Sequence, residues 1–249
     1  MCRKRKEVLS MGTYLHPGKV LFRRATQLEI YVDKTPMIRF LNRVVHTEQG
    51  YVCVSRPRRF GKSMAANMLC AYYDREADGR EVFETRKLAD VTDWDQYLGK
   101  FDVIRLLMTD FFKRNRSLEE GLSAIKERVI LELEEAYPET RYVAGDFEGS
   151  LDRFYRRSGI PFVFVIDEWD VVFRVWKDDK EAQSIYLDFL RDLLKDKPYV
   201  ALAYMTGILP IKKYGDNLAL NMVSIKSVRE WTAGHASGSH VSRACRPFA

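Results

Sequence analysis

The chain has 249 residues, a length that fits one large α/β domain or two small ones. Its composition, 46% hydrophobic and 12% aromatic, can supply a packed core, but no stretch approaches the roughly 20 apolar residues of a membrane span. The formal net charge of +6 permits contact with nucleic acid without requiring it. The four cysteines lack paired spacing and the basic N-terminus lacks a secretory apolar core, so we expect a cytoplasmic protein without a disulfide framework.

The first elements are short. Residues 1–30 form an N-terminal lead-in with turn signals and a helix near 23–27. A β-like segment is expected at 30–33. Thr35 then stands where it can cap a helix over 37–45, whose first turn contains a proline.

A nucleotide phosphate-binding loop is the first motif with chemical content. Residues 59–63, Arg-Phe-Gly-Lys-Ser, separate an apolar strand at 51–54 from a helix-prone segment that is expected to run to Asp74. In such a loop, backbone N–H groups and a helix N-terminus surround a polyphosphate. Lys62 would reach the β- and γ-phosphates, and the Ser63 hydroxyl would contact Mg²⁺.

This motif is incomplete by itself. The full pattern has glycine five residues before Gly61, where this chain has Arg56. Pro57 also lacks the backbone N–H that a phosphate could use. A second element is therefore needed.

An acidic strand end supplies that element. The apolar run at 162–166 predicts a strand buried on both faces of a parallel sheet, and Asp167 and Glu168 follow it directly. At this edge Asp167 would hold Mg²⁺ and Glu168 would polarise the attacking water. The alternative is a strand followed by an acidic helix N-terminus.

The remaining elements alternate between helix and strand, which predicts βαβ units and a parallel sheet. In chain order they are a short helix and turn over 82–88, a strand over 101–108, a helix from the capping box at 117–120 to 137, a helix over 151–157, a helix over 183–194 and a strand over 199–205.

Thr206 ends the last of these strands. In phosphate-loop ATPases with a catalytic glutamate, this strand inserts between the acidic strand and the loop strand, so Thr206 could reach the γ-phosphate or the attacking water. A Thr-Gly turn that closes the strand explains the residue equally well. Asp110 also ends a strand, but this topology puts it at the outer sheet edge, away from the phosphates.

Four segments together resemble the AAA-ATPase-like family of bacterial predicted ATPases, namely residues 31–35, 56–63, 165–168 and 206–214. In that family the loop itself reads Arg-Pro-Arg-Arg-Phe-Gly-Lys-Ser/Thr, so Arg56 is the family's own variant. The resemblance implies a P-loop NTPase: an α/β fold of three layers, α/β/α, with a mainly parallel sheet of the additional-strand, catalytic-glutamate type. It implies ATP and Mg²⁺ as cofactors and a domain over residues 31–222.

Many relatives continue into a restriction-like nuclease domain, whereas the resemblance stops near Met222 in this chain. We therefore expect the last core strand to be missing or altered, and residues 223–249 to form a poorly ordered or aberrant tail. Met11 is a second candidate start. If the last strand is absent, the loop strand becomes an exposed edge that favours pairing with a partner.

The predicted site residues follow from these motifs. Glu168 and Thr206 are the catalytic candidates, and Ser63 and Asp167 are the metal ligands. The residues expected to bind ATP are Arg56, Pro57, Arg58, Arg59, Phe60, Gly61, Lys62 and Ser63.

Several assignments have two interpretations. The loop arginines either contact phosphate or form a solvated loop partly paired with Glu168 or Asp170. Asp33 and Lys34 either line the adenine or ribose side of the pocket or form a helix-entry turn. Lys212 and Lys213 follow Thr206 and are either solvent-facing or near phosphate.

The function that we predict is Mg²⁺-dependent ATP hydrolysis. The alternative is a nucleotide-dependent binding module or switch with little turnover, acting with a protein partner or as a homo-oligomer. Nucleic-acid binding by the basic face is a weaker possibility, and a salt-independent affinity would argue against it. We expect no membrane association.

Overall fold

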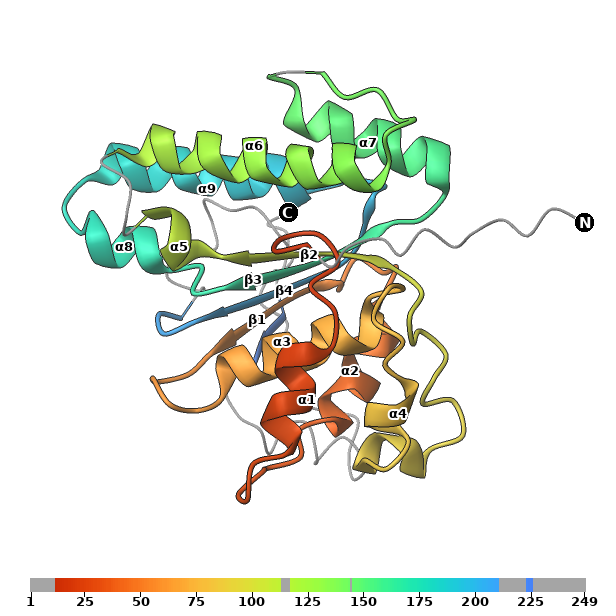
Figure 1. Cartoon of the computed structure of the whole chain (residues 1–249). Helices are drawn as coiled ribbons and strands as arrows, with labels where there is room; N and C mark the ends of the chain where they lie inside the picture. The colour runs from red at the N-terminus through yellow and green to blue at the C-terminus, as the bar shows by residue number, and fades with distance from the viewer. Residues whose placement is uncertain (1–11, 113–116, 144, 211–222, 226–249) are drawn as a thin grey trace, which may run out of the picture.

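A parallel sheet lies between two layers of helices (Figure 1) in the computed structural model, which describes residues 12–112, 117–143, 145–210 and 223–225. Its strands are β1 (Tyr51–Ser55), β2 (Asp102–Leu107), β3 (Phe162–Asp167), β4 (Val200–Gly207) and β5 (Val223–Ile225). Their order across the sheet is β2-β3-β4-β1-β5, and every neighbouring pair is parallel. The predicted α/β fold is confirmed, and β4 lies between β3 and β1 as expected.

The helices cover the two faces of the sheet in chain order (Figure 1). One face carries α1 (Val20–Thr26), α2 (Pro36–Val44), α3 (Lys62–Tyr73), α4 (Arg80–Phe83) and the 3₁₀ helix η1 (Lys87–Asp90). The other face carries α5 (Met108–Phe112), α6 (Leu118–Ala136), α7 (Phe147–Ser158), α8 (Val171–Val175) and α9 (Lys180–Leu194).

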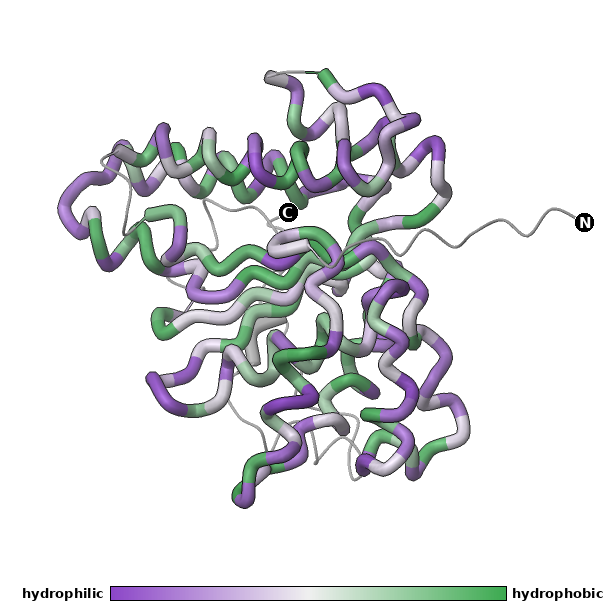
Figure 2. The backbone as a smooth tube through the Cα atoms, in the orientation of Figure 1, coloured by the Kyte–Doolittle hydropathy of each residue, from purple (hydrophilic) through white to green (hydrophobic). Residues whose placement is uncertain are grey.

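Strand β3 shows how the sequence builds both layers. Every residue from Phe162 to Asp167 is buried. Phe162, Phe164 and Ile166 join the core under α6 and α9, whereas the intervening valines join the core under α3. Successive side chains of a strand point to opposite faces, so a continuous apolar run is required when both faces are covered. The apolar strands form the centre of the molecule in Figure 2.

Two local predictions near the N-terminus were wrong. Residues 30–33 form a loop rather than a strand, because Tyr31 turns inward against Phe22 while Ile30 is 84% exposed. Thr35 does not cap α2 with its side chain. Its hydroxyl accepts the backbone N–H of Leu88 from η1 instead, at 3.1 Å.

The last strand was expected to be missing or altered, and the structure excludes only the first alternative, because a strand of three residues is present. Residues Val223–Ile225 pair with β1, with Val52 opposite Val223, so β1 is not an edge strand. Lys212, Lys213 and the segment from Trp231 lie outside the described residues. Among the helices that are described, none combines the length and the apolar character needed to cross a membrane.

Candidate nucleotide site

Three strands end side by side at one edge of the sheet. Thr206 of β4 lies opposite Val54 of β1 on one side and opposite Asp167 of β3 on the other. The loop of residues 56–61 leaves β1 from this position and leads into α3. Its first backbone N–H, that of Arg56, donates to the carbonyl oxygen of Gly207 at 3.0 Å. The predicted loop and the predicted acidic residues therefore meet at the same edge.

The loop turns into α3 at Gly61, which precedes the helix with a φ of 70°. This left-handed conformation strains other residues but not glycine. Lys62, the first residue of α3, folds its ammonium group back over the loop and donates to the carbonyl oxygens of Arg56 and Pro57, each at 3.0 Å. The group is thus held at the mouth of the loop, where it can exchange these neutral acceptors for phosphate oxygens.

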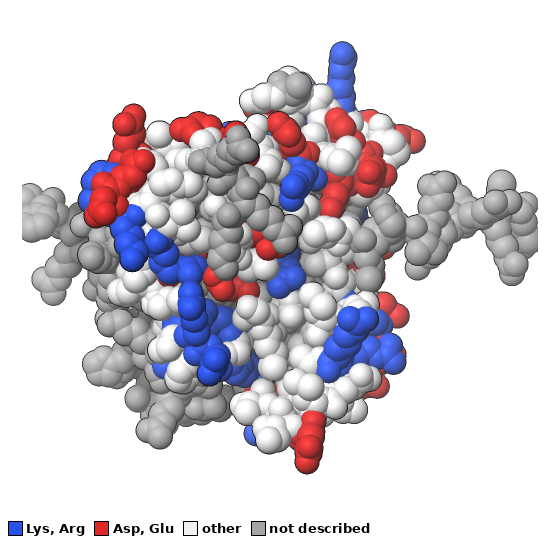
Figure 3. Space-filling view, turned by 60° about the vertical axis from the view of Figure 1, so that its left-hand side comes forward, with Lys and Arg blue, Asp and Glu red and all other residues white. Residues whose placement is uncertain are grey.

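The other loop side chains are open to solvent. Pro57, Arg58, Arg59, Phe60 and Ser63 are all exposed. The Arg56 guanidinium lies 5.6 Å from the centre of the Phe60 ring. Figure 3 turns this side of the molecule forward and shows basic side chains gathered next to a smaller acidic group.

Asp167 is fully buried at the end of β3. Its Oδ1 accepts hydrogen bonds from the Thr206 hydroxyl and from the Glu168 backbone N–H. Its Oδ2 has no hydrogen-bond partner. A buried carboxylate oxygen without a partner is costly, and a cation would satisfy it. Because the Thr206 hydroxyl donates to Asp167, it does not point to an open ligand position in this structure. Thr206 instead orients the Asp167 carboxylate.

Glu168 has a backbone φ of 54°, which is unusual for a residue other than glycine. Its Oε2 accepts a hydrogen bond from the Arg174 guanidinium of α8 at 2.7 Å. Arg174 also lies 3.6 Å from the buried Asp170 carboxylate, whose other oxygen accepts the backbone N–H groups of Ile208 and Leu209. Glu168 and Asp170 are therefore paired with Arg174, a residue that the sequence motifs did not identify.

The residues present fit a magnesium ion bound together with a nucleotide. A buried oxygen of Asp167 lacks a hydrogen-bond partner, and Ser63 is exposed in the first turn of α3, next to the loop. Mg²⁺ is usually held by one or two protein oxygens together with substrate phosphates and water. Within the described residues, no group of three or more His, Cys, Asp or Glu side chains could hold a metal alone.

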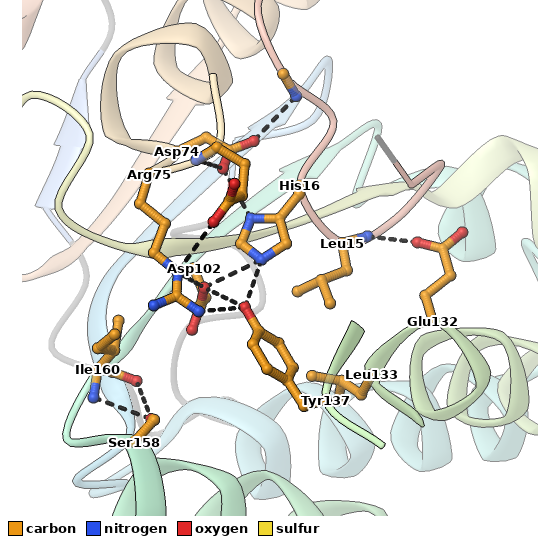
Figure 4. A network of polar contacts seen from close by, with 12 residues as sticks. Leu15, His16, Asp74, Arg75, Asp102, Glu132, Leu133, Tyr137, Ser158 and Ile160 are labelled. Carbon is orange, nitrogen blue, oxygen red and sulfur yellow. Dashed lines mark hydrogen bonds and ion pairs between the residues drawn. The ribbon is translucent and has the colours of Figure 1, made fainter. Parts of the chain in front are cut away.

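A second polar cluster, the His16 cluster, lies at the opposite end of α3 (Figure 4). It consists of His16, Asp74, Arg75, Asp102 and Tyr137. His16 contacts Asp74 at 2.8 Å through Nδ1, and through Nε2 it contacts Tyr137 at 2.8 Å and Asp102 at 3.1 Å. Arg75 lies 2.7 Å from the same Asp102 oxygen.

Burial lowers the pKa of His16, but hydrogen bonds and charges from Asp102 and Asp74 outweigh this effect and raise the pKa to about 9. The protonated cluster holds two cations and two carboxylates, so it is internally neutral. No sequence pattern indicated this cluster, because its members come from four segments that are distant in the chain. His16 is 58 residues from Asp74, and Asp102 is 35 residues from Tyr137.

No curated protein sequence matches the chain. The family model described as "Predicted AAA-ATPase" matches residues 22–215, a range that includes the loop, the acidic end of β3 and Thr206. Membership in such a family suggests an ATPase. Because the match covers more than half of the sequence, the chain belongs to the AAA-ATPase-like family.

Proposed function

We propose that this chain binds ATP with residues 56–63 and hydrolyses it with the help of Mg²⁺. The observation that carries the proposal is the alignment of Asp167, Thr206 and Val54 across three adjacent parallel strands. It brings a basic loop and a buried, half-satisfied carboxylate to one sheet edge, which is where open α/β sheets bind their ligands.

The loop would bind the triphosphate. Lys62 would exchange the carbonyl oxygens of Arg56 and Pro57 for β- and γ-phosphate oxygens, and the N–H groups at the start of α3 would complete the anion site. Arg58 and Arg59 are exposed next to it and would add charge-assisted contacts.

Asp167 and Ser63 would hold the metal ion. When bound, Mg²⁺ would neutralise charge on the phosphate oxygens. Thr206 would keep Asp167 in position through the observed hydrogen bond. Glu168 would accept a proton from the water that attacks the γ-phosphorus, while the bond from that phosphorus to the β–γ bridging oxygen breaks.

The test is to measure ATP binding and phosphate release on the same samples of the parent protein, K62A and E168Q, with Mg²⁺ and with EDTA. We expect K62A to lose ATP affinity, and E168Q to keep ATP but lose turnover, because the glutamate acts only in the transition state. Parent-like ATP binding by K62A would refute the loop as the site. Parent-like turnover by E168Q would refute the role of Glu168.

A nucleotide-dependent switch with little turnover is the second candidate. The contact at 2.7 Å between Glu168 and Arg174 favours it, since a carboxylate oxygen that accepts from a guanidinium is not available to the attacking water. Tight ATP binding without phosphate release by the parent protein would support this candidate. If R174M then acquires turnover, the ion pair is the cause.

A further inference from the structure

Lys34 reaches the phosphate loop from outside its sequence. Its ammonium group donates to the carbonyl oxygen of Phe60 at 2.6 Å and lies 3.4 Å from that of Gly61. A Cβ atom on residue 61 would come within 2.6 Å of this nitrogen. The φ of 70° favours glycine at this position, and a larger residue would in addition displace the ammonium group of Lys34 from the loop.

The two carbonyl groups belong to the peptides whose N–H groups open the anion site. In a trans peptide, C=O and N–H point in opposite directions. A cation that holds the carbonyls of Phe60 and Gly61 therefore fixes the directions of the N–H groups of Gly61 and Lys62. It also polarises both peptides, which strengthens those N–H groups as donors.

A clip of polar contacts holds Lys34 in place. Asp33 accepts the backbone N–H of Thr35 at 2.8 Å and that of Lys87 at 3.0 Å. The Thr35 hydroxyl accepts the N–H of Leu88. The residues before and after Lys34, Asp33 and Thr35, are thus both hydrogen-bonded to η1. These contacts explain why residues 33–35 are polar although they belong neither to the phosphate loop nor to the acidic end of β3.

The ammonium group also belongs to a cluster of cations. Burial lowers the pKa of Lys34, and the charges of Arg56 and Lys62 lower it further. Three cations around one loop repel one another, and a polyphosphate relieves that repulsion.

We infer that Lys34 is a positioning residue of the nucleotide site, which orients the Gly61 and Lys62 peptides toward the β-phosphate from the carbonyl side. The inference rests on the proposed function. It predicts that Lys34 matters for nucleotides that carry a β-phosphate and not for AMP.

The experiment compares the parent protein, K34M, K34R and K87M by calorimetric titration with ATP, ADP and AMP. K34M keeps a long apolar stem, and K34R restores a donor for both carbonyls. K87M is the matched control, because Lys87 is exposed on η1 and its backbone N–H to Asp33 remains. We expect K34M to weaken ATP and ADP binding by roughly tenfold to a hundredfold, with partial rescue in K34R and no change in K87M.

A second readout needs no nucleotide. In ¹⁵N-edited NMR spectra of the free protein, K34M should shift the Gly61 and Lys62 amide signals, and K87M should leave them unchanged. If K34M does not fold, D33A tests the clip instead, because it keeps the ammonium group but removes the acceptor for two backbone N–H groups.

The outcomes separate the two claims. If K62A loses ATP while K34M binds ATP like the parent, Lys34 has no such role but the site stands. Equal losses of affinity for ATP and for AMP in K34M would also overturn the inference, because they would indicate that Lys34 contacts the nucleoside. If K62A binds ATP like the parent, the proposed function fails, and the role of Lys34 fails with it.

Discussion

Helix α3 carries a polar cluster at each end, and the two clusters are built in opposite ways. At its start, the cations of the loop and the carboxylate of Asp167 come from different strands, and Asp167 Oδ2 has no hydrogen-bond partner. At its end, His16 and Arg75 contact the carboxylates of Asp74 and Asp102 directly. Each end also has one buried carboxylate oxygen without a hydrogen-bond partner, Asp167 Oδ2 and Asp102 Oδ2, so the difference between the ends lies in charge pairing. Within the described residues no cation pairs with Asp167, whereas both carboxylates of the His16 cluster contact one, as a structural cluster requires.

The comparison predicts that changes at the His16 cluster affect stability and changes at the loop end affect activity. The largest effect is expected for D102A, which leaves His16 and Arg75 without the oxygen that they share. Removing one partner of a buried ion pair costs about 3–5 kcal/mol. Denaturant unfolding should show this loss. D110A should change stability by less than about 0.5 kcal/mol, because Asp110 is exposed and lies in α5 rather than at the end of a strand, as the sequence had suggested.

The next largest effect is a pH dependence of stability that originates in His16. Its folded pKa of about 9 is above its ordinary value of 6.5, so the stabilisation is complete below pH 6.5 and is lost as the pH rises through 9. The facing groups are Asp74, Arg75, Asp102 and Tyr137.

The loss in the free energy of unfolding amounts to at most about 3 kcal/mol. Unfolding curves of the parent protein and H16N between pH 6 and 10 measure it. A parent profile as flat as that of H16N would contradict the protonated assignment.

D167N tests the loop end. We expect turnover to fall about 100-fold, an effect of about 2.7 kcal/mol on the barrier. The free energy of unfolding should stay the same or rise, because the amide removes a buried charge while its oxygen can still accept from Thr206. If D167N loses as much stability as D102A does, Asp167 has a structural role, and the proposed difference between the two ends of α3 is wrong.

The smallest effect is expected for E132A on α6. Glu132 accepts the backbone N–H groups of Thr13, Tyr14 and Leu15 at 2.7–2.9 Å and so fastens the segment that carries His16. Its loss should cost about 1 kcal/mol and speed hydrogen exchange at those three amides. Exchange as slow as in the parent would show that other contacts hold the segment. E135A, exposed on the same helix, is the control.

Predictions from the sequence succeeded where the signal was local. The apolar run before Asp167 specified a strand that is covered on both faces, and Ser117 caps α6 as predicted, because its hydroxyl accepts the N–H of Glu120. Such patterns depend on neighbours in the chain. The Gly-Lys-Ser motif likewise marked the start of α3, because the turn requires a φ that glycine adopts freely.

The failures have different causes. The Thr35 hydroxyl accepts the N–H of Leu88, 53 residues away, which a local capping rule does not anticipate. Glu168 pairs with Arg174, only six residues further along the chain, but this contact depends on the turn between β3 and α8. The His16 cluster depends on residues from four separate segments. Strand β5 has three residues, too few to produce a recognisable alternation.

The most direct test of the shared site is a crystal structure of E168Q with ATP and Mn²⁺, in which anomalous scattering locates the metal. We expect a metal beside Asp167 and Ser63, with β- and γ-phosphate oxygens within hydrogen-bond distance of Lys62. A nucleotide bound elsewhere, or a metal that does not contact Asp167, would contradict it.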